Sequence, residues 1–347
     1  MFAFHNFPLT KPLADKFREI VSGSKDGRPD WVNTIAVGSG PGLFGPGSAV
    51  WQVHGCIATL VGGVRALLLQ AAHPAPLSGV AEHSRYESDP LGRLAGTTRW
   101  LTVTTFAATE VIDREAARVN AMHDHVKGEF KNKQGHEQSY KAKDPRFLLW
   151  VHCAFTDSFL KAHLALGYPI DQGADTYVAQ WSKSAIPLGL TNAPMSVAEL
   201  EAALDDFRKY DLATVARTAE VVRFILNPPF NGAGAFFYKI ISNAAIATLD
   251  QHELTLLGLE KRSKIWLKIS RISLDLFLAI LGPEAPLTVM LKANALGSII
   301  LWGPPGVGKT TIARLLAKET DLKFVQISAI FSGVPELRKV FQAAQNR

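Results

Sequence analysis

The sequence contains only two cysteines, Cys56 and Cys153, too few for a disulfide framework. They do not stand in a zinc-binding spacing, and so low a cysteine content suits the reducing cytosol. The amino-terminal segment has no apolar core of signal-peptide length, and no uncharged apolar run reaches about 18 residues. We therefore expect a cytoplasmic protein without a transmembrane segment.

Extremes of composition are absent as well. Hydrophobic residues make up 47% of the chain and charged residues 20%, which excludes disorder, collagen and coiled coil as the dominant state. The 347 residues fit about two domains, at roughly 150 residues each. A net charge of +6, spread along the chain, permits an anionic ligand or a weak membrane contact but does not require nucleic acid.

Helical periodicity dominates the first 280 residues. A glycine- and proline-rich segment at 38–47 predicts a loop, with Ser48 as the N-cap of a helix that continues beyond Val53. Within that helix, Gly62 and Gly63 indicate close approach of either a neighbouring helix or a flat ligand.

Further helices are predicted from the spacing of apolar residues, with breaks at His73-Pro74 and at Pro228-Pro229. The polar, lysine-rich segment 130–144 reads as an exposed loop. The predicted helices are 91–107, 114–127, 146–166, 174–183, 196–209, 212–226, 233–247 and 261–281.

The pattern changes near residue 280. Short apolar runs at 298–302 and 323–327 predict strands, with one helix at 309–320 between them and another at 335–344. The fold class expected is therefore mainly α: an all-helical domain over residues 1–280, followed by a short, incomplete α/β P-loop segment over residues 281–347.

A phosphate-binding loop follows the first of these strands and opens a helix, as the motif G-x-x-x-x-G-K-[ST] requires. Its backbone amides would cradle phosphates, Lys309 would reach the β- and γ-phosphates, and the Thr310 hydroxyl would ligate Mg²⁺. ATP with Mg²⁺ is therefore an expected ligand. The predicted cofactor-binding residues are Gly303, Gly306, Gly308, Lys309 and Thr310.

The segment from about residue 282 onward resembles the start of the AAA+ module of the replication-associated recombination protein A family. The resemblance rests on LGPEAPLTVML, GSIILWGPPGVGKTTIARLLAKET and FVQISAIFSGVPELRKVF. The family uses ATP at DNA replication forks and assembles into rings. No Walker-B strand or arginine finger follows the loop here, so we expect a nucleotide site without hydrolysis and do not expect DNA as a partner of this truncated form.

The helical region contains several histidines but none of the common catalytic spacings. H-E-x-x-H, Cys/His zinc pairs, G-x-S-x-G and the Glu-x-x-His pairs of di-iron bundles are all missing. Histidines and arginines in an all-helical domain are compatible with a haem pocket, in which one imidazole binds the iron. A histidine on the apolar face of a helix is, however, more often a satisfied core residue than a ligand.

Four segments of this region are similar to the mpaB/rubber-oxygenase-like family, whose members are related to latex-clearing protein. The resemblance covers roughly residues 30–275 and implies an all-α, globin-like or bundle-like fold, a b-type haem, and cleavage of isoprenoid double bonds with O₂. The segments are GLFGPGSAVWQVHG, GGVRALLLQAAHPAPLSGVAEHSRYESDPLGRLAGTT, RVNAMHDHVKG and DPRFLLWVHCAFTDSFL.

The resemblance implies that His123 is the axial ligand of the haem iron. His125 is the alternative ligand, but two residues apart the side chains point to different sides of a helix, so only one should face the pocket. His152, in the family-typical WVH stretch, is implied as a second polar group of the pocket.

Arg93 and Thr97 match the Arg-x-x-Lys-Thr signature of the rubber oxygenases and stand on one helical face. Gly96 occupies the lysine position, which argues against a distal lysine and against rubber-type chemistry. Alternatively, Arg93 forms an ion pair with Asp89 or Glu87, and the Thr97 hydroxyl bonds back to its own helix.

We therefore expect a haem-dependent oxygenase or oxidoreductase that acts with O₂ on a small apolar, isoprenoid or lipid-like substrate. Two alternatives stand beside this interpretation. One is an ATP-binding AAA+ protein of DNA replication or recombination, to which the helical region is an appendage. The other is a non-catalytic helical binding module with structural histidines. The greater length of the helical domain favours the oxygenase.

Overall fold

The computed structural model describes residues 40–83, 90–230 and 232–281, with residues 31, 32, 35, 338 and 342. The chain divides into two compact units, Met1–Gly282 and Pro283–Arg347. The P-loop and the strands and helices predicted around it lie outside the described residues, except that residues 338 and 342 are helical. The description below concerns the first unit.

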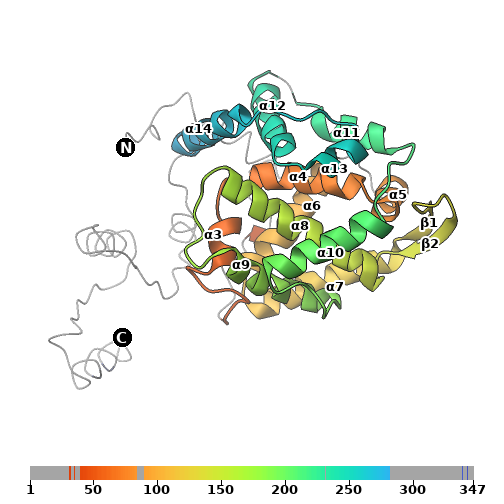
Figure 1. Ribbon diagram of the computed structural model, residues 1–347. Helices are drawn as coiled ribbons and strands as arrows, with labels where there is room; N and C mark the ends of the chain where they lie inside the picture. Colours follow the sequence, from red (N-terminus) through yellow and green to blue (C-terminus); the bar gives the residue numbers. More distant parts are fainter. Residues whose placement is uncertain are drawn as a thin grey trace. The chain divides into compact units, whose positions relative to one another are not determined.

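The first unit is mainly α, as the sequence predicts, with a single two-stranded sheet among its described residues (Figure 1). Its elements in chain order are α3 (Ala49–His54), α4 (Thr59–Ala71), α5 (Pro74–His83), α6 (Pro90–Phe106), α7 (Thr109–His125), β1 (Lys127–Lys131), β2 (Glu137–Lys141), α8 (Pro145–Ala165), α9 (Ala174–Trp181), the 3₁₀ helix η1 (Ser182–Leu188), α10 (Val197–Tyr210), α11 (Thr218–Leu226), α12 (Gly232–Ala247), α13 (Gln251–Leu257) and α14 (Ile265–Leu281).

The centre of the fold is the contact between α4 and α8. Helices α11 and α12 pack on α4, and α10 packs on α8 (Figure 1). A Cβ atom at Gly62 would lie 2.6 Å from Phe159 Cδ1 and 3.1 Å from Phe159 Cα, so α8 approaches α4 most closely at this glycine. Of the two explanations for the glycine pair, the neighbouring helix accounts for Gly62, whereas Gly63 has open space around it.

A buried arginine joins three helices within this core. The Arg65 side chain of α4 is fully buried and lies 2.7 Å from the Asp157 carboxylate of α8 and 3.2 Å from the Glu253 carboxylate of α13. It also donates a hydrogen bond of 2.9 Å to Ser158 Oγ. Burial alone would raise the pKa of Asp157, but Arg65 and Lys161 outweigh it and hold that pKa below its usual value.

The prediction of an exposed loop at 130–144 is wrong. In this part of the chain β1 and β2 form an antiparallel hairpin, with Lys127 opposite Lys141. Gly135, at φ +82°, allows the tight turn between the strands. Each strand buries one aromatic residue, Phe130 or Tyr140, which packs near Phe147. One apolar residue per strand is too weak an alternation to be recognised in the sequence.

Most helix boundaries agree with the prediction to within a few residues. Ser48 is the N-cap of α3, and its hydroxyl accepts a hydrogen bond of 3.2 Å from Trp51 N. The breaks at His73-Pro74 and at Pro228 are present. The long helix expected beyond Val53 is interrupted at Gly55, where a Cβ would lie 2.6 Å from the Trp51 carbonyl oxygen.

The helix expected at 212–226 begins only at Thr218. Instead of continuing a helix, the amide of Ala213 donates a hydrogen bond to the carbonyl of Ala72, which ties this loop to the end of α4. A tertiary hydrogen bond of this kind leaves no pattern in the local sequence. The short helices α5 and α13 were not predicted either.

Alanine substitutions at the adjacent glycines test the packing of α4 on α8. Gly62→Ala is expected to lower the free energy of unfolding by roughly 1–3 kcal/mol, because its methyl group would overlap Phe159. Gly63→Ala is expected to raise it by up to about 1 kcal/mol, because alanine favours the helix and meets no neighbour. Chemical denaturation measures both changes, and equal effects would contradict the close contact.

Candidate functional site

The first two predicted site residues, Arg93 and Thr97, belong to α6. Leu101 packs against the central core, and Thr104 and Thr105 are fully buried. Thr97 precedes Leu101 by one helical turn and is half-buried. The side chain of Arg93, and its proposed pairing with Asp89 or Glu87, lie outside the described residues.

Helices α6 and α7 follow one another in the chain, and α7 carries the next predicted site residue, His123. A short connection joins them, and Arg99 of α6 binds the buried carboxylate of Glu115 of α7, with nitrogen–oxygen distances of 2.6 and 2.8 Å. This pair joins the middle of α6 to the middle of α7. It does not place Thr97 against His123, which lies eight residues beyond Glu115 on α7.

His123 lies on the buried side of α7, whereas His125 is exposed. The Nδ1 atom of His123 is buried and has no hydrogen-bond partner among the described residues. Burial lowers the pKa of His123, and the nearby charge of Lys143 lowers it further, against an opposing effect of Asp124. The imidazole is therefore neutral at pH 7, which is the form that ligates metals.

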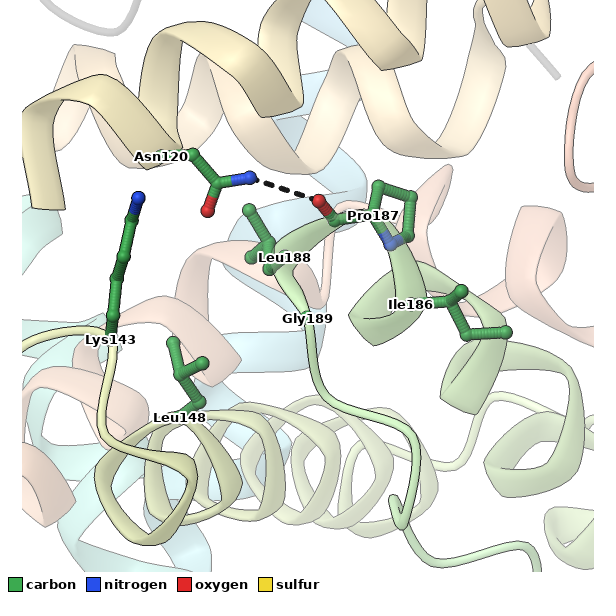
Figure 2. Close-up of a pocket in the computed structure, with 7 residues that line it drawn as sticks. All are labelled: Asn120, Lys143, Leu148, Ile186, Pro187, Leu188 and Gly189. Atoms are coloured by element: carbon green, nitrogen blue, oxygen red, sulfur yellow. Dashed lines mark hydrogen bonds between the residues drawn. The ribbon is translucent and has the colours of Figure 1, made fainter. Parts of the chain in front are cut away.

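A cavity of about 400 Å³ opens next to this end of α7 (Figure 2). Asn120, one helical turn before His123, donates a hydrogen bond of 3.0 Å to the carbonyl of Pro187 in η1. Figure 2 shows Lys143 and Leu148 across the cavity from η1. The cavity thus lies between the end of α7, the start of α8 and η1.

His152 follows Leu148 by one turn on the same face of α8 and is buried. Burial lowers its pKa to about 4, so this imidazole is also neutral. Its Nε2 atom has no partner among the described residues, and neither does the buried hydroxyl of Thr104 on α6. Buried polar atoms without partners are costly, so these atoms require a bound group or water to satisfy them.

The ligand set available for a metal ion is small. In the part of the chain that the structure describes, no group of three or more His, Cys, Asp or Glu side chains could hold a metal ion. A haem iron needs only one axial ligand from the protein, because the porphyrin supplies the other four. The single neutral imidazole of His123 fits that requirement.

His54 of α3, which is not among the predicted site residues, connects α3 with α6 and α9. Its Nε2 lies 2.9 Å from Tyr177 Oη of α9, and its Nδ1 lies 3.3 Å from Thr105 Oγ1 of α6. The Trp181 ring lies 4.2 Å away, and burial lowers the pKa of His54 to about 3. The only signal in the sequence was a polar residue inside an apolar helical stretch.

Comparison with known proteins identifies the family of the helical unit. Residues 51–281 match the family described as "ER-bound oxygenase mpaB/B'/Rubber oxygenase, catalytic domain". The chain belongs to this family. Residues 299–347 match the AAA family, "ATPase family associated with various cellular activities". Both resemblances identified from the sequence are thereby confirmed, and the first unit is an mpaB/rubber-oxygenase catalytic domain.

The curated relatives match the carboxyl-terminal segment only. Replication-associated recombination protein A of Escherichia coli K12 is 45% identical over 69 residues, which cover 20% of this chain and 15% of that protein. The protein of the same name from Coxiella burnetii is 41% identical over 66 residues, 19% of this chain and 15% of the relative. The chain therefore spans only about 15% of the length of these relatives. No solved structure matches the chain.

The buried neutral histidines predict how stability depends on pH. The pKa values of His54, His73 and His152 are lowered to about 3, 3 and 4, against about 6.5 in an unfolded chain. Between these values the unfolded chain binds more protons than the folded chain, so the free energy of unfolding falls as the pH falls below about 6.5. For His152 the loss is on the order of 3 kcal/mol by pH 4.

Thermal unfolding between pH 7 and pH 4.5 measures this dependence. His152→Gln removes one titrating group and is expected to reduce the slope, whereas His125→Gln, at an exposed position, should leave it unchanged. A slope that is identical in wild type and His152→Gln would contradict the burial of a neutral imidazole at this position.

Proposed function

We propose that the first unit is a haem-dependent oxygenase or oxidoreductase that acts with O₂ on a small apolar, isoprenoid- or lipid-like substrate. The observation that carries the proposal is the neutral imidazole of His123, which lies on the buried side of α7 and has an unpartnered Nδ1. Membership of an oxygenase family supports it. The low cysteine content supports a cytoplasmic location.

His123 is the residue that would hold a b-type haem, since the sequence contains no C-x-x-C-H motif for covalent attachment. When bound, the haem supplies the oxygen chemistry, and the polar groups around it steer the outcome. Neutral His152 can donate or accept one hydrogen bond with its free Nε2. Arg93 and Thr97 of α6 are proposed as further polar groups of this site.

The cavity supports a small substrate rather than a polymer. Its volume of about 400 Å³ lies in the range of small-molecule sites, and Leu148, Ile186 and Leu188 give it apolar walls. Gly96 at the family's lysine position also argues against rubber-type chemistry. An apolar molecule that enters beside η1 would pass Asn120 and Lys143, the polar groups at this opening.

Alanine substitutions at the two neighbouring histidines test the haem ligand. His123→Ala is expected to abolish haem binding and the Soret band, because it removes the only protein ligand of the iron. His125→Ala is the matched control and should retain haem, because its side chain is exposed. Equal haem content in the two purified, folded variants would refute the assignment. A wild-type protein that binds no haem would favour the non-catalytic helical module.

We also propose that residues 303–310 bind ATP with Mg²⁺. The complete P-loop motif and the AAA match support this second function. The relatives named as replication-associated recombination protein A make an ATP-binding protein of DNA replication or recombination the competing interpretation of the whole chain. The P-loop residues provide backbone amides and a lysine for the phosphates, and nucleotide binding is therefore the function that we propose for this segment.

Calorimetric titration of the purified chain with Mg·ATP tests the nucleotide site. Lys309→Ala is expected to weaken binding at least about tenfold, because the lysine reaches the β- and γ-phosphates. The same variant should retain its haem, so the two proposed functions are tested separately. Unchanged affinity in Lys309→Ala would contradict the proposal.

A further inference from the structure

One face of α14 exposes a continuous row of large apolar side chains. Ile265, Ile269, Ile272 and Leu276 follow one another at helical spacing, and between 37% and 68% of each is exposed. Such rows on soluble proteins mark surfaces that contact another apolar phase. Phe236 on α12, the helix that packs against α14, is 69% exposed as well.

The opposite face holds α14 firmly on the first unit. Ser270, Leu274 and Phe277 are buried, and the Phe277 ring lies 4.8 Å from the Phe237 ring of α12. Figure 1 shows α14 beside α12 at the periphery of the helical unit. The apolar row is therefore presented by an anchored helix.

A basic row lies directly beside the apolar row. Lys264 and Lys268 are exposed and have no ion-pair or hydrogen-bond partner among the described residues. Arg271 continues the row. It pairs with Asp275, four residues later on the same helix, and donates a hydrogen bond of 2.9 Å to the carbonyl of Leu166. An exposed apolar row flanked by unpaired lysines is the pattern of helices that lie in a membrane interface.

We propose that α14 lies flat on the surface of a bilayer that contains anionic lipids. The isoleucines would enter the boundary between headgroups and acyl chains, and the lysines would contact anionic headgroups. Among the described residues, no helix is long and apolar enough to cross a membrane.

Charge argues against two other occupants of this face. Residues 283–347 contain eight Lys and Arg against four Asp and Glu, and residues 1–39 contain five against four, so neither flanking segment is an anionic complement. A second copy of α14 would bring further unpaired lysines to the contact. An anionic lipid surface complements both rows.

Sedimentation of the full 347-residue chain with lipid vesicles tests the proposal. Vesicles of phosphatidylcholine with phosphatidylglycerol should bind the chain at least about tenfold more strongly than phosphatidylcholine alone, and salt should weaken the binding. Ile272→Glu/Leu276→Glu should abolish binding. The control Met195→Glu places one charge at an equally exposed apolar residue away from α14 and should bind as wild type does.

The variant Lys264→Gln/Lys268→Gln measures the contribution of the basic row to vesicle binding separately from that of the apolar row. This variant should bind the anionic vesicles roughly tenfold or more weakly than wild type, because the negative surface potential of these vesicles attracts each lysine. Its affinity for neutral vesicles should change little. Thermal unfolding and haem content, measured on the same samples, should be unchanged in all variants. Failure of the haem assignment would therefore leave this result intact.

Two results would overturn the proposal. One is a wild-type chain that stays in solution with anionic vesicles, which would mean that another part of the chain covers the face. The other is vesicle binding by Ile272→Glu/Leu276→Glu equal to that of wild type. A dimer that this variant converts to monomer, without any vesicle binding by wild type, would identify a second copy as the occupant instead.

Discussion

The fold depends on the buried charge of Arg65. A guanidinium enclosed in the core is tolerated only if carboxylates and hydrogen-bond acceptors surround it, and loss of one partner of such a group typically costs about 3–5 kcal/mol. Asp157 and Glu253 provide the carboxylates and Ser158 a further acceptor. Because these residues come from α8 and α13, the charge of Arg65 on α4 fixes the positions of three helices at once.

The candidate site takes its geometry from this arrangement. Asp157 lies on the same helix as Leu148, which lines the cavity, and as His152, which lies one turn beyond Leu148 and does not line it. The ion pair that holds α8 against α4 therefore also fixes the position of this wall. Helix α6 is held through the contact of His54 with Thr105, and α7 through the hydrogen bond from Asn120 to Pro187.

The long helices could be predicted from the sequence because each buries a regular apolar stripe. The hairpin at 127–141 could not, since each strand buries one aromatic residue and the rest of its sequence is polar. Helical geometry predicts that His123 and His125 point to different sides of the helix. The structure agrees, since His125 is exposed and His123 is half-buried. The cavity was not predictable, because its wall at Ile186–Gly189 is brought to α7 by tertiary contacts.

The two proposals for the helical unit complement each other. A domain that rests on a bilayer by α14 would meet isoprenoid or lipid-like molecules where they are concentrated, and neither proposal requires the other. The optical spectrum of the purified 347-residue chain tests the assignment of function most directly. One non-covalently bound haem per chain, with a Soret band and complete extraction into acidified organic solvent, is the expected result. A folded chain that remains colourless after haem is added would contradict it.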